Sequence, residues 1–331
     1  MRRNGKTPDQ RGAALIVVLL LVATLSFIAL AIGERSVLAA SRAANVRLSS
    51  ELFWQAVGAE ALARRAIEAA MKATPGKLVS DNPLVAAPIV APFEGGSATI
   101  TVVDRTRCFN INSLVRVDGE GGQSADEAAT TELLELFAAG NAGSIDPEAL
   151  AAAVVDWIDT NNFQEPKGAE DGTYTALPTP YRSGGALLAD ITELRAIAGV
   201  DRAAYGVVRP FLCANPNSAP SILNLNMLTV ADAPLLVAIL AGRKTVADAQ
   251  DIINDRPPGG YGAADVFWTN EAFAGLEISD ATKARIGLFS RYLEVNAAME
   301  YYDAGLDLSL LFEVDGDGRT RLIARRFGRY E

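Results

Sequence analysis

The stretch AALIVVLLLVATLSFIALAIG, residues 13–33, decides the fold of this 331-residue chain. It runs for 21 residues without a charged side chain. As an α-helix it would extend roughly 30 Å, about the thickness of the hydrocarbon core of a bilayer. The stretch therefore predicts a single transmembrane helix close to the N-terminus.

The residues before this stretch are basic, whereas the rest of the chain is acidic. Residues 1–12 hold four basic side chains and one acidic one, although the whole chain has 30 basic and 40 acidic residues and a net charge of −10. Positively charged flanks of a transmembrane helix stay on the cytoplasmic side. We therefore expect a cytoplasmic N-terminus and an acidic body on the opposite side of the membrane.

The helical pattern continues beyond the apolar stretch. Residues 34–74 contain no proline and one glycine, and small or apolar side chains recur there every three or four residues. The Pro75-Gly76 pair then ends the pattern. We expect one helix over about 13–73, on the order of 90 Å long. Its first half would lie in lipid, and its second half would pack on a globular head.

Three interpretations compete for the N-terminus. A secretory signal peptide has an apolar run of only about 7–15 residues before its cleavage site, and an ordinary signal anchor needs nothing beyond the apolar helix. The third interpretation starts from Arg11-Gly12, directly before the apolar run. This arrangement resembles the type IV prepilin leader, in which a peptidase cuts after the glycine and methylates the new N-terminal amine. The uninterrupted long helix favours this interpretation, with cleavage between Gly12 and Ala13.

The remainder of the chain predicts a small sheet divided by a helical block. Alternating β-branched residues predict a strand at 97–104, and 107–115 continues it as a strand or extended turn. Helices are expected near 124–139, 147–157, 187–198, 201–211, 229–241, 245–254 and 262–273, with a Pro-rich connection at 77–95 and a loop at 159–187. Strand patterns return at 288–298, 308–314 and 320–327, the last two joined by a Gly-rich turn. A helical insert of about 170 residues within a sheet domain fits a two-domain chain.

Two segments of the chain are alike. Residues 108–114 read CFNINSL and residues 222–228 read ILNLNML, so each places two asparagines two positions apart between apolar residues. Both segments precede predicted helices. The similarity indicates an internal duplication of a small helical unit, and chance similarity over so short a stretch is the alternative.

The composition excludes several classes of function. The chain has no histidine, which removes Ser-His-Asp and Cys-His catalysis and His-ligated metal sites. Its two cysteines cannot form a four-thiolate site. A net charge of −10 has the wrong sign for binding phosphate backbones, so no nucleic-acid partner is expected. No nucleophile–base pair is visible, and the sequence predicts no enzyme.

Taken in order, these segments resemble the minor pseudopilin K family of type II secretion systems (general secretion pathway protein K). The resemblance covers nearly the whole chain and is carried by residues 11–19 (RGAALIVVL), 109–114 (FNINSL), 156–159 (DWID), 168–174 (GAEDGTY), 192–195 (TELR) and 223–226 (LNLN). It implies an α+β, pilin-like fold, in which a long N-terminal helix packs on a small antiparallel sheet. It also implies a large all-α insertion of two sterile-alpha-motif-like units.

The resemblance divides the chain into six segments. These are a prepilin leader (1–12), the transmembrane half of the long helix (13–34), the first part of the pilin core (35–112), two helical units (113–215 and 216–284) and the C-terminal strands of the pilin core (285–331). The family implies a single-pass protein of the bacterial inner membrane with a periplasmic body. Because that compartment is oxidising and the cysteine count is even, we expect a disulfide between Cys108 and Cys213.

The resemblance also implies a structural role. In this family, protein K joins minor pseudopilins I and J at the tip of the periplasmic pseudopilus and helps to initiate or cap its assembly for protein export. The expected partners are these subunits, the pseudopilus, the prepilin peptidase and the inner membrane, with secreted substrates or the secretin as further contacts. The alternatives are a minor pilin of a type IV pilus or competence machine, and a membrane-tethered helix-hairpin-helix DNA-binding protein.

An acidic loop in the insert is the candidate metal site. It carries Asp156, Asp159, Asn161, Glu170 and Asp171, and crowded oxygen donors on an irregular loop suit calcium. The family resemblance also points to calcium in this insertion, and a solvated acidic loop is the alternative. The second acidic group, in the turn at 315–318, is explained by its Asp-Gly hairpin chemistry alone.

Val17 would be the fifth residue of the mature chain. Most pilins carry a glutamate at that position, where it pairs in lipid with the N-terminal amine of the neighbouring subunit above. A subunit with no neighbour above it has no such partner, and an unpaired carboxylate in lipid is costly. Val17 therefore predicts a position at the tip of the filament.

Overall fold

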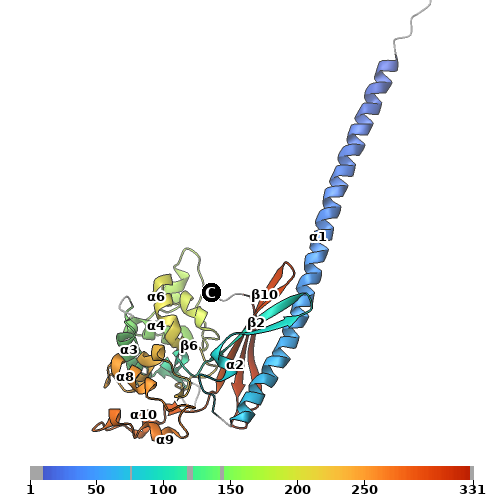
Figure 1. Ribbon diagram of the computed structural model, residues 1–331. Coiled ribbons are helices and arrows are strands. Elements are labelled where there is room, and N and C mark those ends of the chain that lie inside the picture. Colours follow the sequence, from blue (N-terminus) through green and yellow to red (C-terminus); the bar gives the residue numbers. More distant parts are fainter. Residues whose placement is uncertain (1–9, 75–76, 118–121, 142–144, 329–331) are drawn as a thin grey trace, which may run out of the picture.

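The computed structural model describes residues 10–74, 77–117, 122–141 and 145–328. Its dominant element is α1 (Gln10–Ala73), one continuous helix of 64 residues that extends far beyond the globular part (Figure 1). The predicted end of this helix is confirmed at Ala73. Its N-terminal part is long and apolar enough to cross a membrane, with a mean hydropathy of 3.1 over the most apolar window. The side chains of that part are exposed, as expected for a helix that packs against lipid.

The pilin core is a five-stranded antiparallel sheet in the order β1-β2-β9-β10-β11. Its strands are β1 (Ile89–Phe93), β2 (Gly96–Asp104), β9 (Tyr292–Tyr301), β10 (Ala304–Val314) and β11 (Thr320–Phe327). The sequence patterns found all of these strands except β1, which lies with the short helix α2 (Pro83–Ala86) inside the expected connection. Pro92 is tolerated in β1 because this strand forms the edge of the sheet.

The second half of α1 packs on one face of this sheet. Alternate side chains of β9 and β10 point toward the helix, and the register places Val295 opposite Leu310. These side chains form a closed core with one face of the helix, made of Leu52, Ala56, Ile67, Met71, Val102, Val295, Ala297, Met299, Leu308, Leu310, Phe312 and Val314. Two polar contacts join α1 to β11: Glu68 accepts hydrogen bonds from Thr320, and Glu60 pairs with Arg325.

The helical insertion leaves the sheet after β2 and returns at β9, and these two strands are hydrogen-bonded neighbours. Its helices are α3 (Glu127–Ala139), α4 (Pro147–Ile158), α5 (Asp171–Thr175), α6 (Arg202–Val208), α7 (Ala233–Ile239), α8 (Val246–Asn254), α9 (Ala264–Phe267) and α10 (Asp280–Lys283), with 3₁₀ turns η1 (Ile111–Leu114), η2 (Ile191–Ala196), η3 (Arg209–Phe211), η4 (Val230–Asp232) and η5 (Glu271–Phe273). Figure 1 shows these helices grouped beside the sheet, on the side away from α1.

Several predicted helices of the insertion are shorter than expected. The helix expected from residue 124 begins at Glu127, because Gln123–Ala125 pairs as β5 with β4 (Val115–Val117). The stretch expected as a helix at 187–198 is only the 3₁₀ turn η2, which is closed by a capping box between Asp190 and Glu193. Tertiary packing, and not local helix propensity, sets these boundaries.

The two asparagine motifs play the same part in two successive units. β3 (Phe109–Asn110) pairs in parallel with β6 (Leu212–Cys213), and β7 (Leu223–Asn224) pairs in parallel with β8 (Ile286–Gly287). Each motif therefore opens a unit and joins the strand that closes it. The first unit spans 109–213 and the second spans 223–287, and their buried side chains form one continuous core.

The second asparagine of each motif makes the same bidentate contact. Asn112 accepts a hydrogen bond from the backbone N–H of Leu188 and donates to its carbonyl, at 2.9 Å in both cases. Asn226 does the same with Tyr261, at 2.7 and 3.2 Å. Both asparagines are fully buried, so their amides need these partners. The shared contact supports the predicted duplication on grounds independent of sequence similarity.

Candidate functional site

Three carboxylates of the first unit converge on one buried point. Asp156 lies in the last turn of α4, Asp159 caps the C-terminus of that helix, and Glu170 caps the N-terminus of α5. Each offers an oxygen, and these three oxygens lie within 4.8 Å of one another. The residues are 0%, 4% and 9% exposed, respectively. Two helix ends therefore position an acidic triad inside the insertion.

Each member of the triad has one satisfied oxygen and one unsatisfied oxygen. Asp156 Oδ1 accepts from the backbone N–H of Glu165 at 3.0 Å, and Asp159 Oδ2 accepts from Asn161 Nδ2 at 2.8 Å. Asp156 Oδ2, Asp159 Oδ1 and Glu170 Oε1 are buried and have no hydrogen-bond partner among the described residues. Buried carboxylate oxygens without partners are costly, so their convergence is an arrangement that a bound cation would stabilise.

The backbone beside the triad leaves room for these oxygens only because residue 168 is glycine. A Cβ atom at Gly168 would lie 2.1 Å from Asp156 Oδ2. Any side chain there would displace the carboxylate or the loop. Glycine at position 168 therefore allows the backbone of the loop to approach the acidic triad closely.

The electrostatics of the triad favour a cation. Burial, followed by the charges of Glu170 and Asp156, raises the pKa of Asp159 to about 6. Burial is also the main reason why the pKa of Asp156 is raised. Three ionised carboxylates this close repel one another unless a proton or a metal ion lies between them. Oxygen-only donors of this kind match the preference of calcium.

The structure does not bring Asn161 and Asp171 into the triad, although both belong to the ligand set expected from the sequence. The Asp171 carboxylate accepts hydrogen bonds from the backbone and hydroxyl of Ser183 and pairs with Arg182. Asn161 uses its amide N–H to hold Asp159 and its carbonyl oxygen to accept from the backbone of Phe163. Both residues organise the loop around the triad, while their oxygens are engaged elsewhere.

The second unit shows what the acidic loop adds to the first. In the second unit, Tyr261, which is bound by Asn226, follows Asp255 at the C-terminus of α8 by six positions. In the first unit, Leu188, which is bound by Asn112, follows Asp159 at the C-terminus of α4 by 29 positions. The acidic loop is therefore an extension at one junction of the repeat. Such an extension needs its own means of stabilisation, and Glu170 and Gly168 lie within it.

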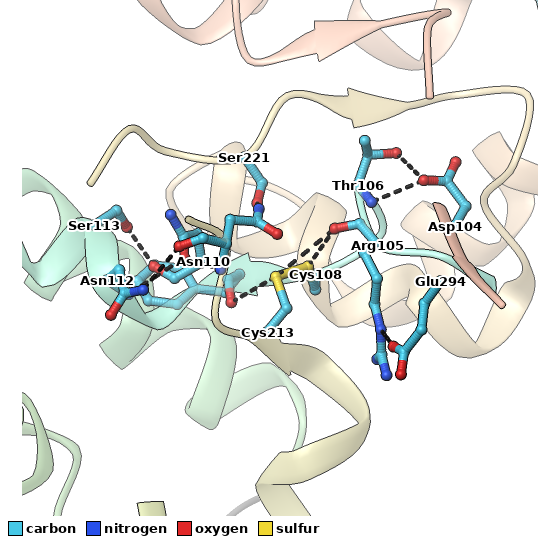
Figure 2. The surroundings of a disulfide bond; sticks show 12 residues. Asp104, Arg105, Thr106, Cys108, Asn110, Asn112, Ser113, Cys213, Ser221 and Glu294 are labelled. Atoms are coloured by element: carbon cyan, nitrogen blue, oxygen red, sulfur yellow. Dashed lines mark hydrogen bonds and ion pairs between the residues drawn. A yellow bond between two sulfur atoms is a disulfide. The ribbon is translucent and has the colours of Figure 1, made fainter. Parts of the chain in front are cut away.

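The disulfide between Cys108 and Cys213 lies where the helical insertion joins the pilin core, a region that we call the neck (Figure 2). Cys108 directly precedes β3, and Cys213 lies in β6, which pairs with β3. Their Cα atoms are 5.7 Å apart, and both residues are buried. The bridge therefore joins the beginning and the end of the first unit at the point where that unit meets the pilin core.

A buried polar network fastens the neck to the sheet. Asp104, the last residue of β2, accepts hydrogen bonds from the backbone and hydroxyl of Thr106 at 2.8 and 2.6 Å and from Ser290 at 2.5 Å (Figure 2 shows the Thr106 contacts). Asn224, the first asparagine of the second motif, donates to Ser290 at 2.8 Å. Nearby, Arg105 forms an ion pair with Glu294 of β9. This network could not be predicted from the sequence, because residues 104–106, 224 and 290 lie far apart along the chain.

The remaining predicted residues lie in α1. Val17 lies in the apolar part of the helix, with 58% of its surface exposed. Gly12 and Ala13 belong to the helical backbone of α1, and their side-chain environment lies outside the described residues. The predicted cleavage bond is therefore within the first turn of the helix.

These features define a membrane-anchored, pilin-like protein with a disulfide-closed helical insertion. Sequence models described as "Type II secretion system (T2SS), protein K" match residues 107–217 and 223–288, which correspond to the two helical units. The chain belongs to this family, and it is a minor pseudopilin of the type II secretion system. A type IV minor pilin and a tethered DNA-binding protein are not favoured by these matches.

Relatives match over almost the full length. Type II secretion system protein K of Pectobacterium carotovorum subsp. carotovorum is 30% identical over 329 residues, covering 97% of both chains. The protein of the same name from Aeromonas hydrophila is 28% identical over 330 residues, covering 97% of this chain and 98% of the relative. The fold is similar to a chain in the crystal structure of the GspK–GspI–GspJ complex of the enterotoxigenic Escherichia coli type 2 secretion system. That likeness has a TM-score of 0.70 at 22% identity and covers 85% of this chain and 99% of the other.

Proposed function

We propose that this chain is the tip subunit of the pseudopilus and acts there as a non-enzymatic initiator or cap of assembly. The observation that carries the proposal is Val17, an apolar residue in the lipid-spanning part of α1 where a shaft subunit needs a carboxylate. The insertion supports the same position. It lies beside the sheet, on the side away from α1, and its bulk would obstruct close packing of subunits if repeated along a shaft (Figure 1).

The position at the tip is tested by imaging. Pseudopili overproduced in cells carrying an epitope-labelled copy of this chain should show the label at one end of each filament. Electron microscopy with gold-labelled antibody measures this directly. Label distributed along the filaments would contradict the proposal, and the labelled chain must support secretion for the result to count.

A second expectation concerns processing of the leader. We expect the bond between Gly12 and Ala13 to be cut and the new amine of Ala13 to be methylated. Mass spectrometry of the mature N-terminus in cells with the prepilin peptidase measures both changes. Gly12→Trp should leave the leader uncut, because a bulky residue blocks the cleavage position. An intact leader on the unaltered chain would return α1 to the class of ordinary signal anchors.

The orientation and the partners follow from the same proposal. The basic residues before α1 would remain in the cytoplasm, and the acidic body would lie in the periplasm. A structural relative was solved in complex with GspI and GspJ, which supports the corresponding minor pseudopilins as partners here. The prepilin peptidase, the secretin and secreted substrates belong to the same proposal. We assign the two duplicated helical units to the sterile-alpha-motif-like class.

We further propose that the acidic triad binds calcium. Asp156, Asp159 and Glu170 would hold the ion through the three oxygens that have no other described partner. The ion would neutralise the charge gathered there and fasten the extended connection between Asp159 and Leu188 to α4. Its role would therefore be structural.

A further inference from the structure

A large cleft lies where the two helical units join the pilin core. Its volume is about 670 Å³, within the range of about 300–1,000 Å³ that is typical of ligand pockets. Its walls come from the linker between the two units (215–222), the start of β9 and the hairpin of β10 and β11. The cleft is separate from the acidic triad and shares no residue with it.

The cleft lies near the C-terminal end of α1, away from the membrane-spanning part of that helix. A Cβ atom at Gly318, in the β10–β11 turn, would lie 2.9 Å from the side chain of Met71, near the end of α1. Thr320, at the start of β11, contacts Glu68. The hairpin turn therefore lies beside the last turns of α1, about forty residues beyond the apolar span, and a lipid headgroup cannot reach it.

The lining of the cleft combines apolar and cationic side chains. Ile222 lines it with 53% of its surface exposed, beside Pro220 and Phe289. Three arginines also line it, and two of them, Arg291 and Arg321, share the single carboxylate of Glu313. A surplus of positive charge thus gathers in a chain whose net charge is −10.

The third arginine has an unused guanidinium group. Arg319 is exposed, and its side chain forms no hydrogen bond or ion pair with the residues that the structure describes. The only other carboxylate lining the cleft, that of Asp315, accepts hydrogen bonds from the backbone N–H groups of Asp317 and Arg319. Arg319 is therefore free to pair with a carboxylate from another molecule.

The cleft continues along the edge of the sheet. A neighbouring cavity of about 410 Å³ shares Arg291, Tyr292 and Arg321 with it and adds Leu322 and Ile323 of β11. β11 is the last strand of the sheet, so among the described residues no strand pairs with the outer side of its backbone. Edge strands bind extended segments through backbone hydrogen bonds, with side-chain pockets supplying specificity.

We propose that this cleft binds an extended, acidic segment of a soluble protein that approaches from the membrane-distal side. Apolar side chains of the segment cover Ile222, while its carboxylates pair with Arg319 and with the Arg291–Arg321 pair. Charge complementarity selects this occupant over a basic one. Nucleic acid is disfavoured, because the acidic body repels a phosphate backbone. The inference depends neither on the tip position nor on calcium.

The test measures binding of a defined probe to the full chain in lipid nanodiscs. The probe is a fluorescein-labelled octapeptide of alternating glutamate and valine, and its matched control replaces each glutamate with lysine. We expect fluorescence polarisation to show binding of the acidic peptide only. Arg319→Glu should weaken it at least tenfold, equivalent to about 1.4 kcal/mol, while Arg319→Lys retains part of it. Ile222→Ser should weaken binding by removing the apolar contact.

The matched control variant is Arg202→Glu, which makes the same charge change at an exposed position on α6. It should leave binding within twofold of the unaltered chain. The proposal would be overturned if the chain bound both peptides equally or did not bind the acidic peptide. It would also be overturned if Arg319→Glu and Arg202→Glu weakened binding equally. Self-association of the chain that Arg319→Glu abolishes would assign the cleft to a second copy and would also overturn it.

Discussion

Replacing Cys108 with alanine is expected to lower the free energy of unfolding of the insertion by about 4–5 kcal/mol under oxidising conditions. The bridge joins residues separated by 105 positions, and closing so long a loop removes much of the conformational entropy of the unfolded chain. Both cysteines are buried at the neck, so the folded state holds the bridge in place. Urea unfolding followed by circular dichroism measures the loss.

The controls for this prediction use the second cysteine. Cys213→Ala should cost about as much as Cys108→Ala, and the double variant should cost no more than either one, because all three remove the same bridge. A reducing agent should lower the stability of the unaltered chain to the level of the double variant. Losses that add in the double variant, or two reactive thiols in the unreduced, denatured chain, would show that the cysteines are not joined.

Features that depend on local periodicity could be predicted from the sequence. α1 has one helical stripe over its second half and a Pro-Gly pair directly after it, so its end at Ala73 was predictable. The strands β2, β10 and β11 could be recognised from their β-branched and apolar residues and from the Gly-rich turn between β10 and β11. β1 could not be recognised, because its proline argues against a strand, and only pairing with β2 across the turn at Gly95 makes it one.

The acidic site was predictable in its position but not in its membership. Asp156 and Asp159 stand three residues apart at a helix end, which places both on one side of the last turn. Glu170 and Asp171 are adjacent, and sequence alone cannot say which of them faces the helix. In the folded chain, Ser183 and Arg182 bind Asp171, and Glu170 is the N-cap residue that completes the triad with Asp156 and Asp159.

The asparagine motifs show the same limit at the level of the fold. Their similarity predicted a duplication, but the role of each amide was not predictable, since Asn112 binds Leu188 and Asn226 binds Tyr261 across 76 and 35 positions of the chain. The different lengths of these two connections reveal the acidic loop as an extension of one unit. The acidic loop is thus a clear difference between two units that share the asparagine contact.

Calcium is therefore expected to stabilise the first unit, and its effect should depend on pH. Without the ion, the pKa of Asp159 is about 6 in the folded chain and 3.8 in the unfolded chain. Between these two pH values, the folded state therefore binds more protons than the unfolded state. The stability contributed by this protonation is complete below pH 4 and is lost as the pH rises through 6. The ion replaces the proton, so calcium should stabilise the chain strongly at pH 7 and progressively less as the pH falls below 6.

At pH 7, calcium at a hundredfold excess over its dissociation constant should stabilise the folded state by about 2.7 kcal/mol. Because the two units share one core and together span 109–287, this raises the melting temperature of the insertion by about 5–10 °C. Differential scanning calorimetry of chelator-treated chain, with and without calcium, measures the shift.

Asp159→Asn should abolish the calcium-dependent shift in melting temperature, because that change removes a carboxylate of the triad. Asp171→Asn, the matched control next to Glu170, should retain it, since the Asp171 carboxylate is held by Ser183 and Arg182. Loss of the shift in Asp171→Asn would restore the ligand set expected from the sequence, whereas an unaltered chain with no response to calcium would eliminate the site.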